Sequence, residues 1–206
     1  MKYTNKKFLV RVSTAIVLFL ISLIVNFYAG TFATARASNA VNDLVLNNIP
    51  VFNVDLFFVY GPLVVWFFVA WFCLIKPQRI PFVFKSLALF VLTRSLFITL
   101  THIGPFPDHA IIDYSSDFIK RFSFGGDLFF SAHTGLPFLM ALVFWRHRRL
   151  RLFFISASIF FGVIVLLGHL HYSIDVLSAF FITYSIYHLA LYLFKEDARL
   201  FNDGLG

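Results

Sequence analysis

The stretch Gly168-His169-Leu170-His171-Tyr172-Ser173-Ile174-Asp175-Val176 joins two long apolar runs and places two imidazoles and one carboxylate between them. A second polar cluster, residues 127–135 (DLFFSAHTG), opens the apolar run that precedes these two. Titratable groups at the ends of apolar runs are typical of a membrane protein with a functional site near the membrane surface. The composition of the whole chain supports this interpretation.

The chain is too apolar and too sparsely charged for an ordinary soluble domain. Of its 206 residues 60% are hydrophobic and 13% are charged, whereas soluble domains are about one quarter charged. The net charge of +7 lies in short clusters between apolar runs, which indicates membrane topology rather than a nucleic-acid groove. The single Cys73 cannot form a disulfide within the chain.

Six apolar runs of helix length predict an all-α, polytopic protein with six transmembrane helices in one domain, residues 1–206. They are too long for the alternating strands of an outer-membrane barrel. The predicted spans are residues 8–29, 56–75, 82–102, 128–145, 152–168 and 173–194.

The segment between the first two runs carries two further interpretations. Small residues at 33–37 leave a cleaved signal peptide as an alternative to the first span. Part of the segment, residues 33–46, is predicted to form an amphipathic helix lying on the membrane.

The distribution of Lys and Arg predicts that both termini are cytoplasmic. With that orientation, 13 of the 17 basic residues lie inside or flank inside segments, namely Lys2, Lys6, Lys7, Arg11, Lys76, Arg79, Lys85, Arg146, Arg148, Arg149, Arg151, Lys195 and Arg199. The histidine clusters then lie at the outer face. We therefore expect an integral protein of the plasma or inner membrane with an extracytoplasmic active site.

Three titratable groups are expected at one depth on that face. His171 and Asp175 are four residues apart, which places them on one side of a helix. A carboxylate on one imidazole nitrogen fixes the tautomer and raises the basicity of the other nitrogen, so His171 can attack phosphorus. His133, one to two turns into the fourth predicted helix, can protonate a leaving oxygen. The alternative is that such histidines only bond neighbouring helices.

Further residues are candidates for binding phosphate. Arg94 lies within the third span, where an unpaired guanidinium costs several kcal/mol, and it either binds phosphate or pairs with an outer carboxylate. Ser131 lies close to a helix N-terminus, which favours anions, and Asp127 is either part of the site or the N-cap of that helix. Tyr172 and His169 complete the predicted substrate-binding set, although we derive no specific role for His169. Lys120 and Arg121 are weaker candidates in a loop.

Other chemistries lack their motifs. His169 and His171 are two residues apart and would point away from each other on a helix, and there is no His-Glu-x-x-His, so no metal is predicted. There is no Gly-x-Ser-x-Gly elbow for Ser131 and no Walker loop. No cofactor is predicted.

Three segments resemble the sphingomyelin synthases, a branch of the type 2 phosphatidic acid phosphatase superfamily. Residues 126–134 (GDLFFSAHT) are similar to the Gly-Asp-x-x-x-Ser-Gly-His-Thr motif of those enzymes. Residues 168–181 (GHLHYSIDVLSAFF) resemble their motif His-x-His-Tyr-Thr-x-Asp-Val followed by Ala-Tyr-Tyr. Residues 94–107, from Arg94 to Pro107, resemble a third-helix motif that ends near Pro-x-Pro. The resemblance covers residues 56–194.

The resemblance implies a six-helix membrane fold with His171 as nucleophile, Asp175 as its partner and His133 as general acid. It also implies a phospholipid donor whose head group passes to a second lipid alcohol or to water. Ala132 replaces the usual glycine. The Lys-x6-Arg-Pro motif of the phosphatase branch is absent, and Val165 stands where that branch has arginine, so the synthase branch is favoured.

The sequence therefore predicts a membrane lipid phosphotransferase or phosphatase that acts through a phosphohistidine. The predicted partners are the bilayer, a phospholipid and a second lipid acceptor, without nucleic acid. The alternative is a non-catalytic lipid transporter or pseudoenzyme of the same fold. The head group, the acceptor and the oligomeric state are left open.

Overall fold

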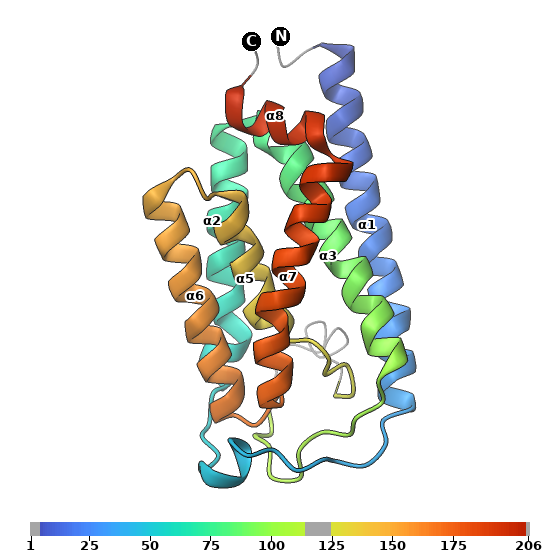
Figure 1. Ribbon diagram of the computed structural model, residues 1–206, viewed down its shortest axis with the longest axis vertical. Coiled ribbons are helices and arrows are strands. Elements are labelled where there is room, and N and C mark those ends of the chain that lie inside the picture. The colour runs from blue at the N-terminus through green and yellow to red at the C-terminus, as the bar shows by residue number, and fades with distance from the viewer. Residues whose placement is uncertain (1–4, 114–124, 205–206) are drawn as a thin grey trace.

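The computed structural model describes residues 5–113 and 125–204, and all regular secondary structure in these ranges is helical. The long helices are α1 (Lys6–Ala35), α2 (Gly61–Ile75), α3 (Ile80–Leu100), α5 (Ala132–Val143), α6 (Arg148–Leu167) and α7 (Ser173–Leu193). Shorter segments are η1 (Leu46–Asn48), the π-helical turn η2 (Leu56–Tyr60), η3 (Pro77–Arg79) and α8 (Lys195–Asp203). The long helices form one bundle, with the start of α1 and the crossing helix α8 at the same end (Figure 1).

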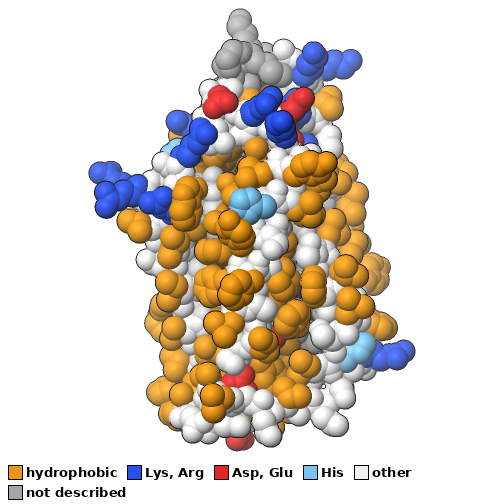
Figure 2. All heavy atoms as spheres, viewed as in Figure 1, with side chains coloured by type: hydrophobic (Ala, Val, Ile, Leu, Met, Phe, Trp, Pro, Cys, Tyr) orange, Lys and Arg blue, Asp and Glu red, His pale blue; other side chains and the backbone are white. Residues whose placement is uncertain are grey.

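Five helical segments are long and apolar enough to cross a membrane: Lys6–Ala35, Leu56–Ile75, Pro77–Leu100, Arg148–Leu167 and Ser173–Leu193. The apolar helix α5 has 12 residues and is about 18 Å long, shorter than the hydrocarbon core of about 30 Å. In the described ranges there are thus five candidate spans and one shorter apolar helix. Figure 2 shows apolar side chains over the middle of the visible face and most of the visible Lys and Arg near α8. These features indicate an integral membrane protein.

The helices pack as two groups around an aromatic core. α1 packs along α3, and α5 packs against both α6 and α7. Only some of the many Phe side chains can face lipid. Five of them are at most 2% exposed: Phe82, Phe90, Phe130, Phe144 and Phe154. Their rings contact one another at the edges and faces, as Phe90 and Phe130 do at 5.3 Å between centroids. The close packing of α5 with its neighbours fixes the position of its first turn.

The segment after α1 is not the predicted amphipathic helix. α1 continues to Ala35, and residues 37–43 are not helical, so the prediction of a helix over 33–46 is wrong. The Oδ1 atom of Asp43 accepts the N–H groups of Val45 at 2.8 Å and Leu46 at 3.1 Å. An aspartate whose side chain accepts the backbone N–H groups two and three residues later stabilises a turn, which competes with a continuous helix.

The fourth apolar run starts its helix later than predicted, at Ala132 instead of Leu128. Ser131 is the N-cap, and its hydroxyl accepts the N–H of Thr134 at 3.4 Å. The interpretation of Asp127 as the N-cap is therefore wrong. The residues after Phe194, which lie beyond the last predicted span, form α8.

Candidate active site

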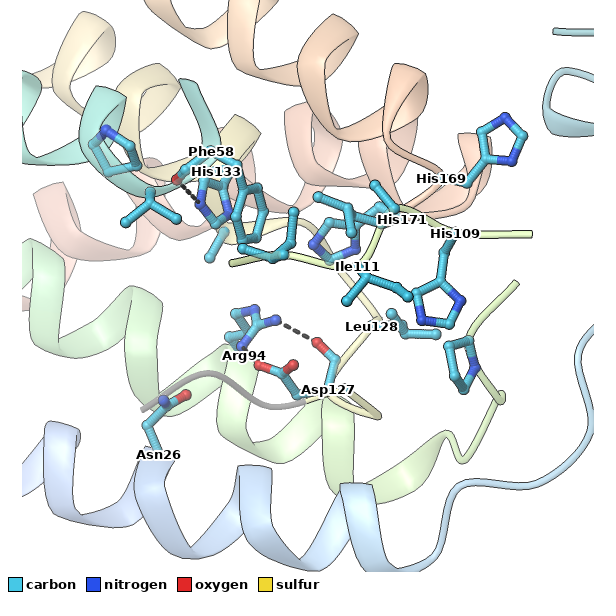
Figure 3. Close-up of a pocket in the computed structure, with 18 residues that line it drawn as sticks. Asn26, Phe58, Arg94, His109, Ile111, Asp127, Leu128, His133, His169 and His171 are labelled. Atoms are coloured by element: carbon cyan, nitrogen blue, oxygen red, sulfur yellow. Dashed lines mark hydrogen bonds and ion pairs between the residues drawn. The ribbon is translucent and has the colours of Figure 1, made fainter. Parts of the chain in front are cut away.

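A cavity of about 570 Å³ lies beside the starts of α5 and α7 (Figure 3). In Figure 1 the start of α7 lies at the end of the bundle opposite α8. The cavity gathers side chains from α1, α3, α5 and several connecting segments. Its lining consists of Asn26, Phe58, Val59, Pro62, Arg94, Pro105, His109, Ala110, Ile111, Ile112, Gly125, Asp127, Leu128, Ala132, His133, His169, Leu170 and His171. Five of the predicted site residues therefore line one space: Arg94, Asp127, His133, His169 and His171.

His171 and Asp175 form a buried pair at the start of α7. The Nδ1 atom of His171 lies 3.4 Å from the Oδ2 atom of Asp175, and the side chains are 8% and 0% exposed. The same Oδ2 atom accepts the backbone N–H of Tyr172 at 2.9 Å, which holds the carboxylate at the helix start. With the Nδ1 proton directed to Asp175, the lone pair of Nε2 is free to act as a nucleophile.

A backbone hydrogen bond joins the two polar clusters of the sequence. The N–H of Ser131 donates to the carbonyl of Asp175 at 3.1 Å. This bond brings the start of α5 against the start of α7, so the residue that caps one helix is tied to the carboxylate residue of the other. His133 and His171 reach the same cavity because their helices begin side by side.

His133 lies in the first turn of α5, not one to two turns inside it as predicted, because the helix starts only at Ala132. Its ring stacks on Phe58 with a centroid distance of 4.2 Å, and its Nε2 atom lies 3.3 Å from the Phe58 carbonyl. Phe161 contacts the ring at its edge. The imidazole is therefore held between η2 and α6 at the cavity wall (Figure 3).

His133 also lines a second, apolar cavity of about 200 Å³. The two cavities share Pro62, Ala132 and His133. The remaining walls of the smaller cavity are Val65, Trp66, Leu136, Pro137 and Phe161. A polar cavity thus meets an apolar one at the imidazole of His133.

Arg94 is buried, and each of its three guanidinium nitrogen atoms donates a hydrogen bond. Its Nε–H donates to the carbonyl of Phe130 at 2.9 Å, and Nη1 donates to the carboxylate of Asp127 at 2.9 Å. Nη2 donates to the backbone carbonyl of Asp127. Figure 3 shows this pair on the wall opposite His133. Of the two interpretations of Arg94, pairing with a carboxylate is therefore present, and Arg94 also lines the cavity.

Three other predicted residues have structural contacts of their own. The hydroxyl of Ser131 caps α5, and Ser131 is fully buried and does not line the cavity. The hydroxyl of Tyr172 donates to the Gly104 carbonyl at 2.8 Å and accepts the Val41 N–H at 3.2 Å. Burial raises the pKa of Tyr172, although the bond from Val41 opposes this, so the hydroxyl stays protonated.

His169 borders the cavity, but its ring is turned away from Arg94 and His133 (Figure 3). Its Nδ1 atom lies 2.7 Å from the carbonyl of Asp108, and its backbone has a φ of 52°. This left-handed residue turns the chain between α6 and α7 and ties the turn to the loop after α3.

The sequence did not identify several lining residues. Asn26 reaches the cavity from the middle of α1, and Phe58 and His109 come from connecting segments. A single asparagine in an apolar run, or an aromatic ring among 30 Phe residues, carries no signal of its own. The candidates Lys120 and Arg121 lie outside the described residues. Within the described ranges, no three His, Cys, Asp or Glu side chains are grouped as a metal site.

Comparison with protein families gives one match. Residues 125–192 match the model of the PAP2 superfamily C-terminal domain. The matched region contains His133, His171 and Asp175 but not Arg94 or Asn26. No curated protein and no solved structure matches the chain. The match supports the PAP2 superfamily and suggests a lipid enzyme of the phosphatase or phosphotransferase type.

Proposed function

We propose that this chain is a membrane-embedded lipid phosphotransferase or phosphatase in which His171 forms a phosphohistidine. The observation that carries the proposal is the shared cavity. A histidine beside a buried carboxylate, a second histidine from another helix and an arginine all face one space of about 570 Å³. That set supplies a nucleophile, a proton donor and a cation for the phosphate oxygens.

In the first step, Nε2 of His171 attacks phosphorus and the P–O bond to the leaving alcohol breaks. Protonated His133 gives its proton to the leaving oxygen. Asp175 stabilises the positive charge that develops on the His171 ring, as a carboxylate does for the histidine of a catalytic triad. Arg94 lies beside the phosphate oxygens, and Asp127 and the Phe130 carbonyl hold its guanidinium in a fixed plane.

In the second step, an acceptor hydroxyl attacks phosphorus and the N–P bond breaks. His133, now neutral, removes the proton of the acceptor and returns to its starting state. When the acceptor is a lipid alcohol the reaction is a transfer, as in the sphingomyelin synthases that the sequence resembles. When the acceptor is water the reaction is hydrolysis.

The apolar second cavity supports a lipid substrate. A phosphate at His171 lies in the polar cavity, and hydrocarbon attached to it has an adjoining apolar space beyond His133. The walls Val65, Trp66 and Leu136 provide no charge or amide, so they favour methylene groups over water. A lipid therefore fits the joined cavities better than a soluble phosphate ester does.

We place this site on the extracytoplasmic side of a plasma or inner membrane. The support is the distribution of Lys and Arg, which gather near the opposite end of the bundle. Head-group transfer would then take place in the outer leaflet.

The test uses purified protein in detergent with labelled phospholipids, with and without ceramide or diacylglycerol, and products resolved by mass. His171→Ala is expected to lower turnover at least about 10³-fold and to abolish a labelled, acid-labile phosphoenzyme. Turnover that persists in this variant refutes the mechanism. The same protein is also reconstituted into phospholipid vesicles, where lipid movement between leaflets without any head-group release supports the alternative of a non-catalytic transporter or pseudoenzyme.

A further inference from the structure

Asp43 lies far from the histidines in sequence but holds the start of α7. Its carboxylate is buried, with the residue 6% exposed. Oδ2 accepts the backbone N–H of Ser173, the first residue of α7, at 2.7 Å. Oδ1 accepts the N–H groups of Val45 and Leu46. One carboxylate therefore connects the segment between α1 and α2 with the helix that carries Asp175.

A second set of bonds holds the same place. The hydroxyl of Tyr172 bonds the Gly104 carbonyl and the Val41 N–H. The two segments that this hydroxyl joins also bond each other directly, because the Gly104 N–H donates to the backbone carbonyl of Asn39 at 3.1 Å. A Cβ atom on Gly104 would lie 2.2 Å from the Ser38 carbonyl, so only glycine allows this approach.

These contacts bracket the proposed catalytic pair. Ser173 and Tyr172 directly follow His171 and precede Asp175, and their bonds to Asp43, Val41 and Gly104 come from outside the bundle core. The pair itself is joined by one contact of 3.4 Å. A change in the orientation of the first turn of α7 would therefore move His171 relative to Asp175.

We propose that Asp43 is a positioning residue for the reaction: its carboxylate fixes the first turn of α7 and thereby aligns His171 with Asp175 and the cavity. The inference rests on the proposed function. It adds to that function a segment, residues 36–50, that lies outside the matched family region. We therefore expect a substitution of Asp43 to lower the rate of the chemical step without changing the affinity for the lipid substrate.

The chemistry of the site requires a carboxylate and not an amide. Asp43 accepts three N–H groups through two oxygens. Asparagine has one oxygen and one NH₂ group, so it must direct the NH₂ either at the N–H of Ser173 or at those of Val45 and Leu46. Asp43→Asn therefore loses one side of the connection while it keeps the size of the side chain.

Ser173 offers a matched variant that removes only the other partner. Ser173→Pro deletes the N–H that Asp43 accepts, and proline is well tolerated as the first residue of a helix. The preceding Tyr172 has φ −70° and ψ 156°, a conformation that a residue before proline favours. Ser173→Ala removes the hydroxyl alone and is the control for the side chain. Asn42→Ala, at an exposed neighbour of Asp43, is the control for the segment.

The experiment measures kcat and KM for the lipid substrate and the thermal midpoint of each purified variant, with kcat expressed per folded protein. Asp43→Asn and Ser173→Pro are each expected to lower kcat at least about tenfold with KM within about twofold. The double variant should be no slower than the slower single variant, because both interrupt the same connection through Asp43 to the start of α7. Asn42→Ala should stay within about twofold of the original kcat. Ser173→Ala keeps the N–H but removes a hydroxyl that also bonds Asp43, so it should lose less activity than Ser173→Pro.

A thermal midpoint that falls while kcat per folded protein stays unchanged overturns the inference, since Asp43 then has only a structural role. Losses that multiply in the double variant overturn it as well. If Asp43→Asn fails to fold, full kcat in Ser173→Pro refutes the inference by itself. The proposed function fails separately, by full turnover in His171→Ala.

Discussion

The two ends of the bundle both bury charge, but they use it differently. Near the termini, Asp197 accepts Lys85 Nζ at 2.6 Å and Arg11 Nη1 at 3.0 Å, which ties α8 to α3 and α1. At the other end, Arg94 and Asp127 form a similar pair, and two imidazoles from other helices face the same cavity. A buried ion pair by itself therefore indicates a structural connection between helices. Additional titratable groups that converge on one space mark a candidate site.

The largest effect is expected from Asp175→Asn at the cavity end. The amide leaves the fold intact but no longer fixes the His171 tautomer or balances the charge on its ring, so kcat should fall about 10³- to 10⁴-fold. Single-turnover measurement of phosphoenzyme formation tests this. A loss of less than tenfold would mean that Asp175 only caps α7. Asp203→Asn, at an exposed carboxylate near α8, serves as the matched control.

His133→Gln should lower kcat about 10²- to 10³-fold with natural lipid leaving groups. The glutamine keeps polar contact with Phe58 but cannot donate a proton readily. An aryl phosphate ester, whose leaving group needs no protonation, should lose less than about tenfold in the same variant. Equal losses with both substrates would contradict the role of His133 as general acid.

Arg94→Lys should have a moderate effect, about a 30-fold loss in kcat/KM. Lysine keeps the charge but cannot reproduce the three donors that reach Phe130 and Asp127. Inhibition by orthovanadate, which mimics five-coordinate phosphorus, should weaken in parallel. Unchanged vanadate affinity would show that Arg94 serves only to hold Asp127.

At the opposite end, Asp197→Asn should leave kcat per folded protein unchanged within about twofold. It should lower the free energy of unfolding by about 3 kcal/mol, because Lys85 loses its carboxylate partner in a partly buried place and Arg11 keeps only Glu196. Denaturation in detergent measures the change. A loss of activity without loss of stability would break the distinction between the two ends.

The smallest effect concerns acid stability at Asp43. Burial alone would raise the pKa of Asp43, but the N–H groups of Ser173, Leu46 and Val45 and the hydroxyl of Ser173 outweigh it and hold the pKa below its ordinary value of 3.8. The carboxylate therefore contributes stability above pH 3.8 that is lost as the pH falls through its lowered folded-state pKa. The thermal midpoint of the original protein should exceed that of Asp43→Asn at neutral pH, and the gap should shrink below pH 3.8. A constant gap would contradict this.

The sequence alone determined the helical class, most of the apolar helices and the pairing of His171 with Asp175. Apolar length and the spacing of four residues are local properties, and a helix converts both directly into structure. The polar clusters at 127–135 and 168–176 were recognisable because titratable side chains are rare in such runs.

Only the tertiary structure decided which residues complete the site. Asn26, Phe58 and His109 enter the cavity through the packing of separate segments, and no pattern within their own runs indicates it. The role of Asp127 was left open and that of Asp43 was not identified, because their partners, Arg94 and the Ser173 N–H, are far away in the sequence. A carboxylate accepts whichever donors the fold brings to it. Local sequence therefore showed where acids lie, and the packed helices decided what each acid does.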